Sequence, residues 1–304
     1  MIKVLLMYLL MCPTFAVADQ YDPTYVIGWG SFGIGPYNFK APIGILYYNN
    51  EVYVCNRDMD RIQVYSVDGI YIRQFGIYGT APGLLDSPNY LYLYNNLLYI
   101  SEYGNDRVSI FTPAGSFVST FGEGHLDQPH AIYISDENIY VVNRALSNVA
   151  IFDLDGVYIS TFGSYGTANG QFKQPVGITG ALGKIYVADT YNNRIQTFEL
   201  NGTYSSSIPS TFPLGLKNLD GTIYCTKRDG IIRYTYDFQI LAEWGCQGNL
   251  YNYYFNNPYD ISWDGINSLY ISDTDNHRVQ KWHYLGQGSV PVNQVTWGQL
   301  KRRY

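Results

Sequence analysis

Apolar and polar residues alternate along most of this chain with the period of two that is typical of β-strands. Many alternating stretches place a tyrosine between two apolar residues, as in the Val-Tyr-Val of residues 52–54 and the Ile-Tyr-Val of residues 185–187. The stretches that follow them alternate and end on an aromatic residue, as from Arg61 to Tyr65. No stretch of useful length has the helical period after the apolar amino-terminal segment. The pattern therefore predicts an all-β protein.

An aromatic residue followed by glycine recurs along the chain at near-constant spacing. The copies are Trp29-Gly30, Phe75-Gly76, Phe121-Gly122, Phe162-Gly163, Trp244-Gly245 and Trp297-Gly298. The steps between the aromatic residues are 46, 46, 41, 82 and 53 residues, and because 82 is twice 41, one copy has decayed after Phe162. A period in the forties that is built from short strands indicates a repeat array.

Each repeat contains four strand signals in the same order. The first begins at a proline, and the six prolines are Pro42, Pro88, Pro129, Pro175, Pro213 and Pro258. The tyrosine-centred strand and the alternating strand come next, and a turn such as Asp68-Gly69 leads into a fourth strand that ends at the aromatic-glycine pair. Four antiparallel strands with tight turns form a propeller blade. Six prolines therefore predict a six-bladed β-propeller.

The two ends of the chain bear on how this ring closes. Residues 25–29 precede the first proline, so they cannot belong to the four strands of the first blade. We expect them to supply the outer strand of the last blade, which would join the ends and cover two sheet edges. Residues 294–297 are the competing candidate for that position.

Two segments resemble an NHL repeat closely. One combines residues 175–178 (Pro-Val-Gly-Ile), 185–190 (Ile-Tyr-Val-Ala-Asp-Thr) and 193–196 (Asn-Arg-Ile-Gln), and the other is residues 272–280 (Ser-Asp-Thr-Asp-Asn-His-Arg-Val-Gln). The resemblance extends over residues 25–298, although the third unit has Asn148 in place of arginine and the fifth unit is short. It implies an NHL-type six-bladed propeller, a family whose members mostly recognise proteins and in other cases RNA, glycans or small ligands.

Composition and charge narrow the classes of binding partner and the expected location of the protein. The chain has 304 residues, 46% hydrophobic content, 32 tyrosines and a net charge of −6. Such an acidic chain is a poor candidate for nucleic acid, because lysine and arginine drive phosphate binding. Residues 1–18 have a positive start, an apolar run and an Ala-Val-Ala cleavage signal, which predicts a signal peptide and an exported protein, extracellular, periplasmic or at the cell surface. Residues 19–299 then form the propeller and 300–304 a short basic tail, with no stable membrane span.

Three cysteines remain after residue 18, which is an odd number for an exported protein. Cys225 and Cys246 lie 21 residues apart, and export would allow a disulfide between them. Cys55 is expected to be unpaired in either case.

A polar set repeats once per blade. Its carboxylate position holds Asp189 and Asp273, with Glu102, Asn56 and Asn143 at the equivalent places, and its arginines are Arg61, Arg107, Arg194 and Arg278. A group that is needed once per blade is expected to hold the blade together, because arginine can bridge a carboxylate and turn carbonyls.

The candidate binding site lies where the inner strands begin. Side chains just after each proline should meet at the central channel, and the polar or aromatic ones are Asn89, Tyr90, His130, Tyr259 and Asp260. Their neighbours from other blades are apolar or lack a side chain, which is the usual form of a ligand pocket. A water-filled channel mouth without a ligand is the alternative.

One of these residues also suggests an enzyme. The Pro-His pair of Pro129 and His130 matches a dipeptide in the amidating lyases, which resemble this chain in repeat pattern and which bind zinc through histidines near the inner strands. One histidine does not make a three-ligand zinc site. The lactonase-like propellers, which use scattered Glu, Asn and Asp ligands, are a second enzymatic alternative. We therefore expect a monomeric module that binds a protein, a glycan or a small ligand, with no cofactor, and zinc or calcium only under the enzymatic alternatives.

Overall fold

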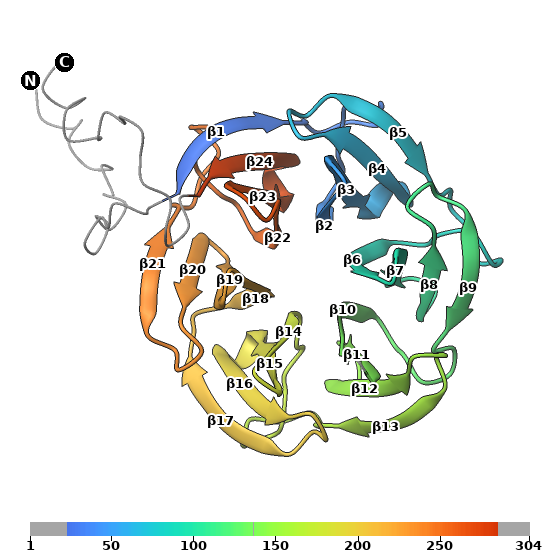
Figure 1. Cartoon of the computed structure of the whole chain (residues 1–304), viewed down its shortest axis with the longest axis vertical. Helices are drawn as coiled ribbons and strands as arrows, with labels where there is room; N and C mark the ends of the chain where they lie inside the picture. The colour runs from blue at the N-terminus through green and yellow to red at the C-terminus, as the bar shows by residue number, and fades with distance from the viewer. Residues whose placement is uncertain (1–22, 136, 285–304) are drawn as a thin grey trace, which may run out of the picture.

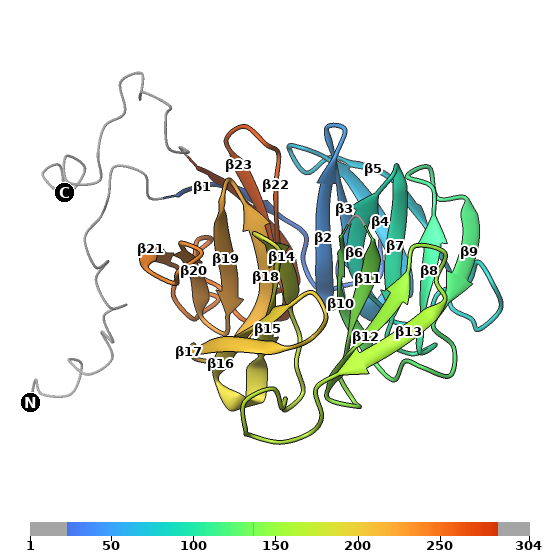
Figure 2. The same ribbon diagram turned by 60° about the horizontal axis from the view of Figure 1, so that its bottom comes forward.

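The computed structural model describes residues 23–135 and 137–284, which form six four-stranded antiparallel sheets around a central axis (Figure 1). Figure 2, turned by 60°, shows the sheets as twisted blades that stand side by side around the ring. The all-β class and the six-bladed propeller are confirmed. None of the residues described forms a helix that is long and apolar enough to cross a membrane.

In blades one to five the four strands follow one another in chain order from the axis outward, and blade six takes its outermost strand from the amino-terminal side. Blade one has β2 (Pro42–Tyr48), β3 (Glu51–Asn56), β4 (Arg61–Ser66) and β5 (Tyr71–Phe75), and blade two has β6 (Pro88–Tyr94), β7 (Leu97–Glu102), β8 (Arg107–Phe111) and β9 (Phe117–Phe121). Blade three has β10 (Pro129–Ile134), β11 (Asn138–Asn143), β12 (Asn148–Asp153) and β13 (Tyr158–Phe162), and blade four has β14 (Ile178–Ala181), β15 (Lys184–Asp189), β16 (Arg194–Glu199) and β17 (Tyr204–Pro209). Blade five has β18 (Pro213–Leu219), β19 (Thr222–Lys227), β20 (Gly230–Tyr234) and β21 (Ile240–Trp244), and blade six has β22 (Pro258–Trp263), β23 (Ser268–Asp273), β24 (Arg278–His283) and β1 (Thr24–Trp29). Single 3-10 turns follow the second strand of three blades, as η1 (Arg57–Met59), η2 (Thr190–Asn192) and η3 (Thr274–Asn276).

The amino-terminal strand closes the ring, as expected from its place before the first proline. β1 pairs with β24 in antiparallel register, from Thr24 opposite His283 to Trp29 opposite Val279. The first described strand thus completes the last blade and covers its outer edge. The competing candidate, residues 294–297, lies outside the described residues. The decayed repeat is also a real strand, since β17 ends at Pro209 without the aromatic-glycine pair.

Two repeated features of the sequence explain how neighbouring blades pack together. They are the aromatic residue that ends an outer strand and the glycine of the turn before an outer strand. The aromatic residue that ends each of four outer strands lies against the turn glycine of the following blade, as Phe121 lies against Gly156. A Cβ atom at Gly156 would come within 2.7 Å of Phe121 Cβ. The other pairs are Trp29 with Gly69, Phe75 with Gly115 and Phe162 with Gly202. The sequence period therefore reflects a contact between successive blades.

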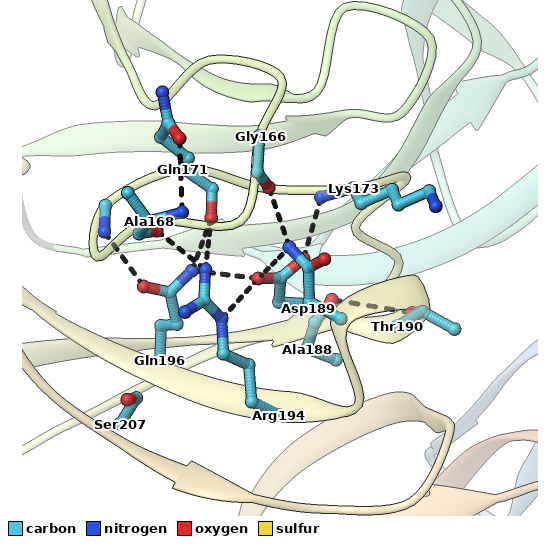
Figure 3. Close-up of polar contacts among 12 residues, drawn as sticks. Gly166, Ala168, Gln171, Lys173, Ala188, Asp189, Thr190, Arg194, Gln196 and Ser207 are labelled. Atoms are coloured by element: carbon cyan, nitrogen blue, oxygen red, sulfur yellow. Dashed lines mark hydrogen bonds and ion pairs between the residues drawn. The ribbon is translucent and has the colours of Figure 1, made fainter.

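The repeated polar set lies inside the blades, and Figure 3 shows it in blade four. Arg194 Nε donates to Asp189 Oδ2 at 2.7 Å, and its Nη2 donates to the carbonyl oxygens of Ala168 and Gln171 at 2.8 Å. Asp189 Oδ1 accepts the backbone N–H of Lys173 at 2.8 Å. The cluster thus ties the loop before the inner strand to the middle of its blade, and blade six repeats it through Asp273 and Arg278 at 2.7 Å.

The structure contradicts one of the two predictions about the cysteines. Cys225 is a free, buried thiol as far as the described residues go, so the predicted Cys225–Cys246 disulfide is wrong. Cys225 pairs with Leu216 and Ile232 in the interior of blade five, whereas Cys246 follows the end of the outer strand β21. Burial raises the pKa of the Cys225 thiol to about 12. Cys55 is likewise free and buried within the described part of the chain, as expected.

Candidate functional site

The first strand of every blade lines the central axis, and these six inner strands all begin at the same end of the ring (Figure 1). We call this end the proline end, because five of the strands start on a proline and the sixth, β14, starts three residues after Pro175. The turn between the second and third strand of each blade reaches the same end, since Pro42 pairs with Asn56 and Pro129 with Asn143.

Two of the predicted site residues meet across the axis. His130 on β10 and Tyr259 on β22 stack with ring centroids 5.8 Å apart and an angle of 21° between the planes. Their strands belong to blades three and six, which face each other across the central axis in Figure 1. Tyr103, which follows β7, meets the edge of the His130 ring at 6.2 Å. Aromatic side chains from three blades therefore gather at the proline end.

The electrostatics of this aromatic group depend on nearby arginines. Burial lowers the pKa of His130 well below its ordinary value, and the positive charges of Arg144 and Arg57 lower it further. Burial raises the pKa of Tyr259, which the same two arginines oppose. His130 is therefore a neutral ring at physiological pH, close to two guanidinium groups.

A second pair of opposite blades is bridged by Lys217, which the analysis of the sequence missed. Lys217 Nζ lies 4.3 Å from the centre of the Tyr90 ring, across the axis from β18 to β6, and 3.7 Å from Asp260 Oδ2. Burial raises the pKa of Asp260 to about 6, against the opposing charge of Lys217. Burial lowers the pKa of Lys217, which Asp260 opposes. A lysine four positions after Pro213 was the available signal, since apolar, aromatic or hydroxyl side chains stand there in the other inner strands.

Asp260 is also part of the scaffold. Its Oδ2 accepts the backbone N–H of Ile45 in blade one at 3.1 Å, and its Oδ1 accepts that of Ile261 at 2.9 Å. It therefore holds the last blade to the first in addition to facing the lysine.

Asn89 is fully buried, and neither its amide nitrogen nor its oxygen has a hydrogen-bond partner within the described residues. The same is true of the Tyr90 hydroxyl in that part of the chain. Contacts thus unite four of the five predicted residues in two groups, His130 with Tyr259 and Tyr90 with Asp260 through Lys217. The side chain of Asn89 makes no hydrogen bond to either group in the part of the chain described here, and no three His, Cys, Asp or Glu side chains gather there into a metal site.

A separate groove of about 510 Å³ lies between blades four and five. Its walls include Tyr186, Tyr236 and Phe238, and Lys184 lies at its side. The second, third and fourth strands of blade four line it, so it lies away from the axis.

Comparison with known proteins agrees with this geometry. Residues 172–198 match the family model of the NHL repeat, and they contain the cluster of Asp189 and Arg194. The chain is a six-bladed β-propeller that carries an NHL repeat. Within this propeller the matched residues extend from the loop before β14 through most of β16.

Solved structures with a similar fold include two lyases and a nidogen/laminin complex. A streptogramin B lyase structure aligns over 88% of this chain and 100% of its own, with a TM-score of 0.62 and 15% identity. The virginiamycin B lyase of Staphylococcus aureus aligns over 88% and 100%, with a TM-score of 0.60 and 14% identity. A nidogen/laminin complex aligns over 68% of this chain and 81% of its own, with a TM-score of 0.58 and 16% identity. These identities show a shared fold alone, and no curated protein sequence matches the NHL propeller significantly.

Proposed function

We propose that this NHL propeller is an exported binding module that recognises a protein, a glycan or a small ligand at its proline end. The observation that carries the proposal is a set of exposed aromatic side chains on four equivalent loops. Each of these lead-in loops connects an outer strand to the next inner strand, and together they comprise residues 30–41, 76–87, 163–174 and 245–257.

The lead-in loops present large side chains to solvent. Phe32 is 66% exposed, Tyr78 and Tyr165 are each 69% exposed, and Tyr251 is 53% exposed. Each loop is braced by a bridge to a residue three positions before its proline, such as Tyr78 to Leu85, and the bridges of three loops begin at the exposed aromatic residue itself. Exposed apolar groups that gather on one face of a protein mark interaction sites, and tyrosine is enriched at interfaces.

The predicted channel residues would form the floor of this face. His130 and Tyr259 stack at its centre, and Asn89, Tyr90 and Asp260 lie beside them on inner strands. Asn89 and the Tyr90 hydroxyl have buried polar atoms without a partner among the described residues, which a ligand group or ordered water would satisfy. We assign His130 and Tyr259 to ligand contact, and Asp260 to contact and scaffold together.

The test is a glycan array together with photo-crosslinking from position 78 to secreted proteins, using the protein from residue 19 onward. We expect a ligand whose affinity falls at least about tenfold, roughly 1.4 kcal/mol, when Tyr78→Ser and Tyr165→Ser are combined. Leu182→Ser with Ile266→Ser is the matched control, because these side chains are 75% exposed and lie on turns at the opposite end. A ligand that binds both double variants equally would refute the assignment of the face.

Export has its own test. The amino terminus of secreted protein should be Asp19, because the Ala-Val-Ala of residues 16–18 precedes it. Full-length protein that retains Met1 inside the cell would contradict export.

A further inference from the structure

We propose that the centre of the proline end binds a small carboxylate, with Arg144 as its main cation and Arg57 as the second. The inference rests on the proposed function, because it names the ligand chemistry at the centre of the same face.

Arg144 is a cation without a matching anion. The repeat arginines of three other blades each donate to a carboxylate, as Arg107 to Glu102 at 2.8 Å, Arg194 to Asp189 at 2.7 Å and Arg278 to Asp273 at 2.7 Å. Arg144 forms no ion pair within residues 23–135 and 137–284. Its Nη2 donates to Gln174 Oε1 at 2.9 Å and its Nη1 lies 3.4 Å from Tyr103 Oη, so neutral groups hold it in place.

One donor of this guanidinium is both buried and unused. Arg144 Nε has no hydrogen-bond partner in the described structure, although its solvent exposure is close to zero. Buried donors are nearly always satisfied in folded proteins, so an unsatisfied one at a functional face indicates a missing acceptor. A carboxylate can accept from two donors of one guanidinium at once, which suits this residue.

The two arginines reach the same place from different blades. Arg144 follows Asn143, which pairs with Pro129 at the start of β10, and Arg57 follows Asn56, which pairs with Pro42 at the start of β2. Both charges act on the His130 ring and on the Tyr259 ring. Arg57 pairs with Asp58 at 2.9 Å, but the side chain of Arg57 is partly exposed and that of Asp58 is exposed, and a pair in contact with solvent contributes little. Arg57 can therefore turn toward a ligand at small cost.

The aromatic side chains around the two arginines favour an anion that also has an apolar part. The stacked rings of His130 and Tyr259, with Tyr103 at their edge, form an apolar floor beneath the arginines. Because His130 is neutral, it adds a hydrogen-bonding nitrogen without a further positive charge. The chain as a whole has a net charge of −6, so two arginines that act on one aromatic group stand out in it, with Asp275 as the acidic group that also acts on Tyr259. An organic carboxylate fits this combination better than a phosphate, which would use more donors.

Three carboxylates and their neutral counterparts form the test, namely acetate with acetamide, benzoate with benzamide, and glucuronate with glucose. Each is titrated into the protein by calorimetry, and the His130 ring signals are followed by NMR. We expect at least one carboxylate to bind saturably, to shift the His130 signals, and to bind at least about tenfold more tightly than its neutral counterpart.

Variants assign that binding to the arginines. Arg144→Gln should weaken it about tenfold or more, and Arg144→Lys should restore only part of it because the planar fork is lost. Arg57→Gln, at a partly exposed position, should weaken it about threefold, and it tests the inference if Arg144→Gln does not fold. Lys184→Gln, the same charge change on β15 beside the outer groove, should leave it unchanged.

Three results would overturn the inference: no saturable carboxylate binding, equal binding of the neutral counterparts, or inorganic phosphate binding as tightly as the best carboxylate. The failure would be distinct from failure of the proposed function, because ligand binding through Tyr78 and Tyr165 is measured separately. A macromolecular ligand that depends on those tyrosines would leave the binding module intact without its carboxylate site.

Discussion

In the first blade, Asn56 occupies the position that a carboxylate fills in blades two, four and six. Its Oδ1 still accepts the backbone N–H of Lys40 at 2.8 Å, which is the contact common to these blades. Its other terminal atom, Nδ2, is a donor, which bonds to Asn38 O and Gln63 Oε1. The amide therefore has no second oxygen to accept from Arg61, whose Nε is buried without a partner within the described residues. In the blades that have a carboxylate here, its ion pair with arginine and its hydrogen bond to the loop are thus separate contributions of one side chain.

This separation predicts the effect of restoring the carboxylate. Asn56→Asp should raise the free energy of unfolding by about 1 kcal/mol at pH 7, because Arg61 Nε gains a charged acceptor. Denaturant unfolding measures the change. The matched control is Asn143→Asp in blade three, where Asn148 replaces the arginine, and it should destabilise by about 1–3 kcal/mol as a buried, uncompensated acid. Equal effects of the two substitutions would contradict the role given to the arginine.

Asp260 gives the propeller a predictable dependence on pH. Because burial raises its pKa to about 6 in the folded state, the folded protein binds this proton more tightly than the unfolded chain. The resulting stabilisation is complete below pH about 4 and is lost as the pH rises through about 6. Between pH 4 and pH 7, the free energy of unfolding should therefore fall by about 2–3 kcal/mol more in the wild type than in Asp260→Asn. Urea unfolding across this range measures it, and parallel profiles would show that Asp260 titrates normally.

At the scale of the element, the blades are held to one another by the aromatic residue that ends an outer strand. Each of four such residues covers a turn glycine of the next blade, and all four of these glycines have positive φ between 80° and 92°. Glycine is thus required for two reasons at once, the backbone conformation and the absence of a side chain. The aromatic-glycine pairs recur at near-constant spacing along the chain because the same contact between blades is repeated.

Substitutions at two glycines can separate the cost of the backbone conformation from the cost of the added side chain. Gly124 and Gly156 both have φ of 81°, but a Cβ at Gly124 would meet nothing within 4 Å among the described residues, whereas one at Gly156 would meet Phe121 Cβ at 2.7 Å. Gly124→Ala should cost about 1 kcal/mol for the left-handed conformation alone. Gly156→Ala should cost about 1–3 kcal/mol more, because Phe121 must move. Thermal unfolding of the two variants provides the comparison, and equal losses would show that the aromatic contact is loose.

The sequence predicts elements well and their partners less well. Strand order, turns and the number of blades follow from local alternation and turn chemistry, which are properties of a few consecutive residues. The outer strand β17 was expected even though Ile208 and Pro209 replace its aromatic-glycine pair. The Cys225–Cys246 prediction failed because a sequence separation carries no information about which face of a sheet, or which depth in a blade, a thiol occupies. The sequence predicted that side chains after the prolines meet at the axis, as His130 and Tyr259 do, but not which residues pair there, and the contact of Lys217 with Tyr90 was missed.

At the scale of the whole molecule, the ring is closed by one strand from the amino-terminal side, β1, which pairs with β24 along its length. Without it, blade six would have three strands and an exposed edge. Closure also places Trp29 against Gly69 of blade one, so the same strand supports both neighbours.

Deleting residues 1–30 should therefore do more than remove one strand. We expect aggregation and a lower unfolding temperature, because the last and first blades lose their common outer contact. Deletion of residues 1–18 is the control, since it leaves β1 in place. Light scattering and calorimetry report the two effects. A soluble variant with an unchanged unfolding temperature would mean that residues 294–297 can replace β1.

The closure also has a consequence for the order of events during synthesis. About 250 residues separate the end of β1 from the start of β24, so at about 5–20 residues per second the first strand waits roughly 12–50 s for its partner. During that interval the strands of blades one to five are made one after another, while β1 has no partner strand. The last pairing step of the fold therefore involves β1, the earliest made of the described strands.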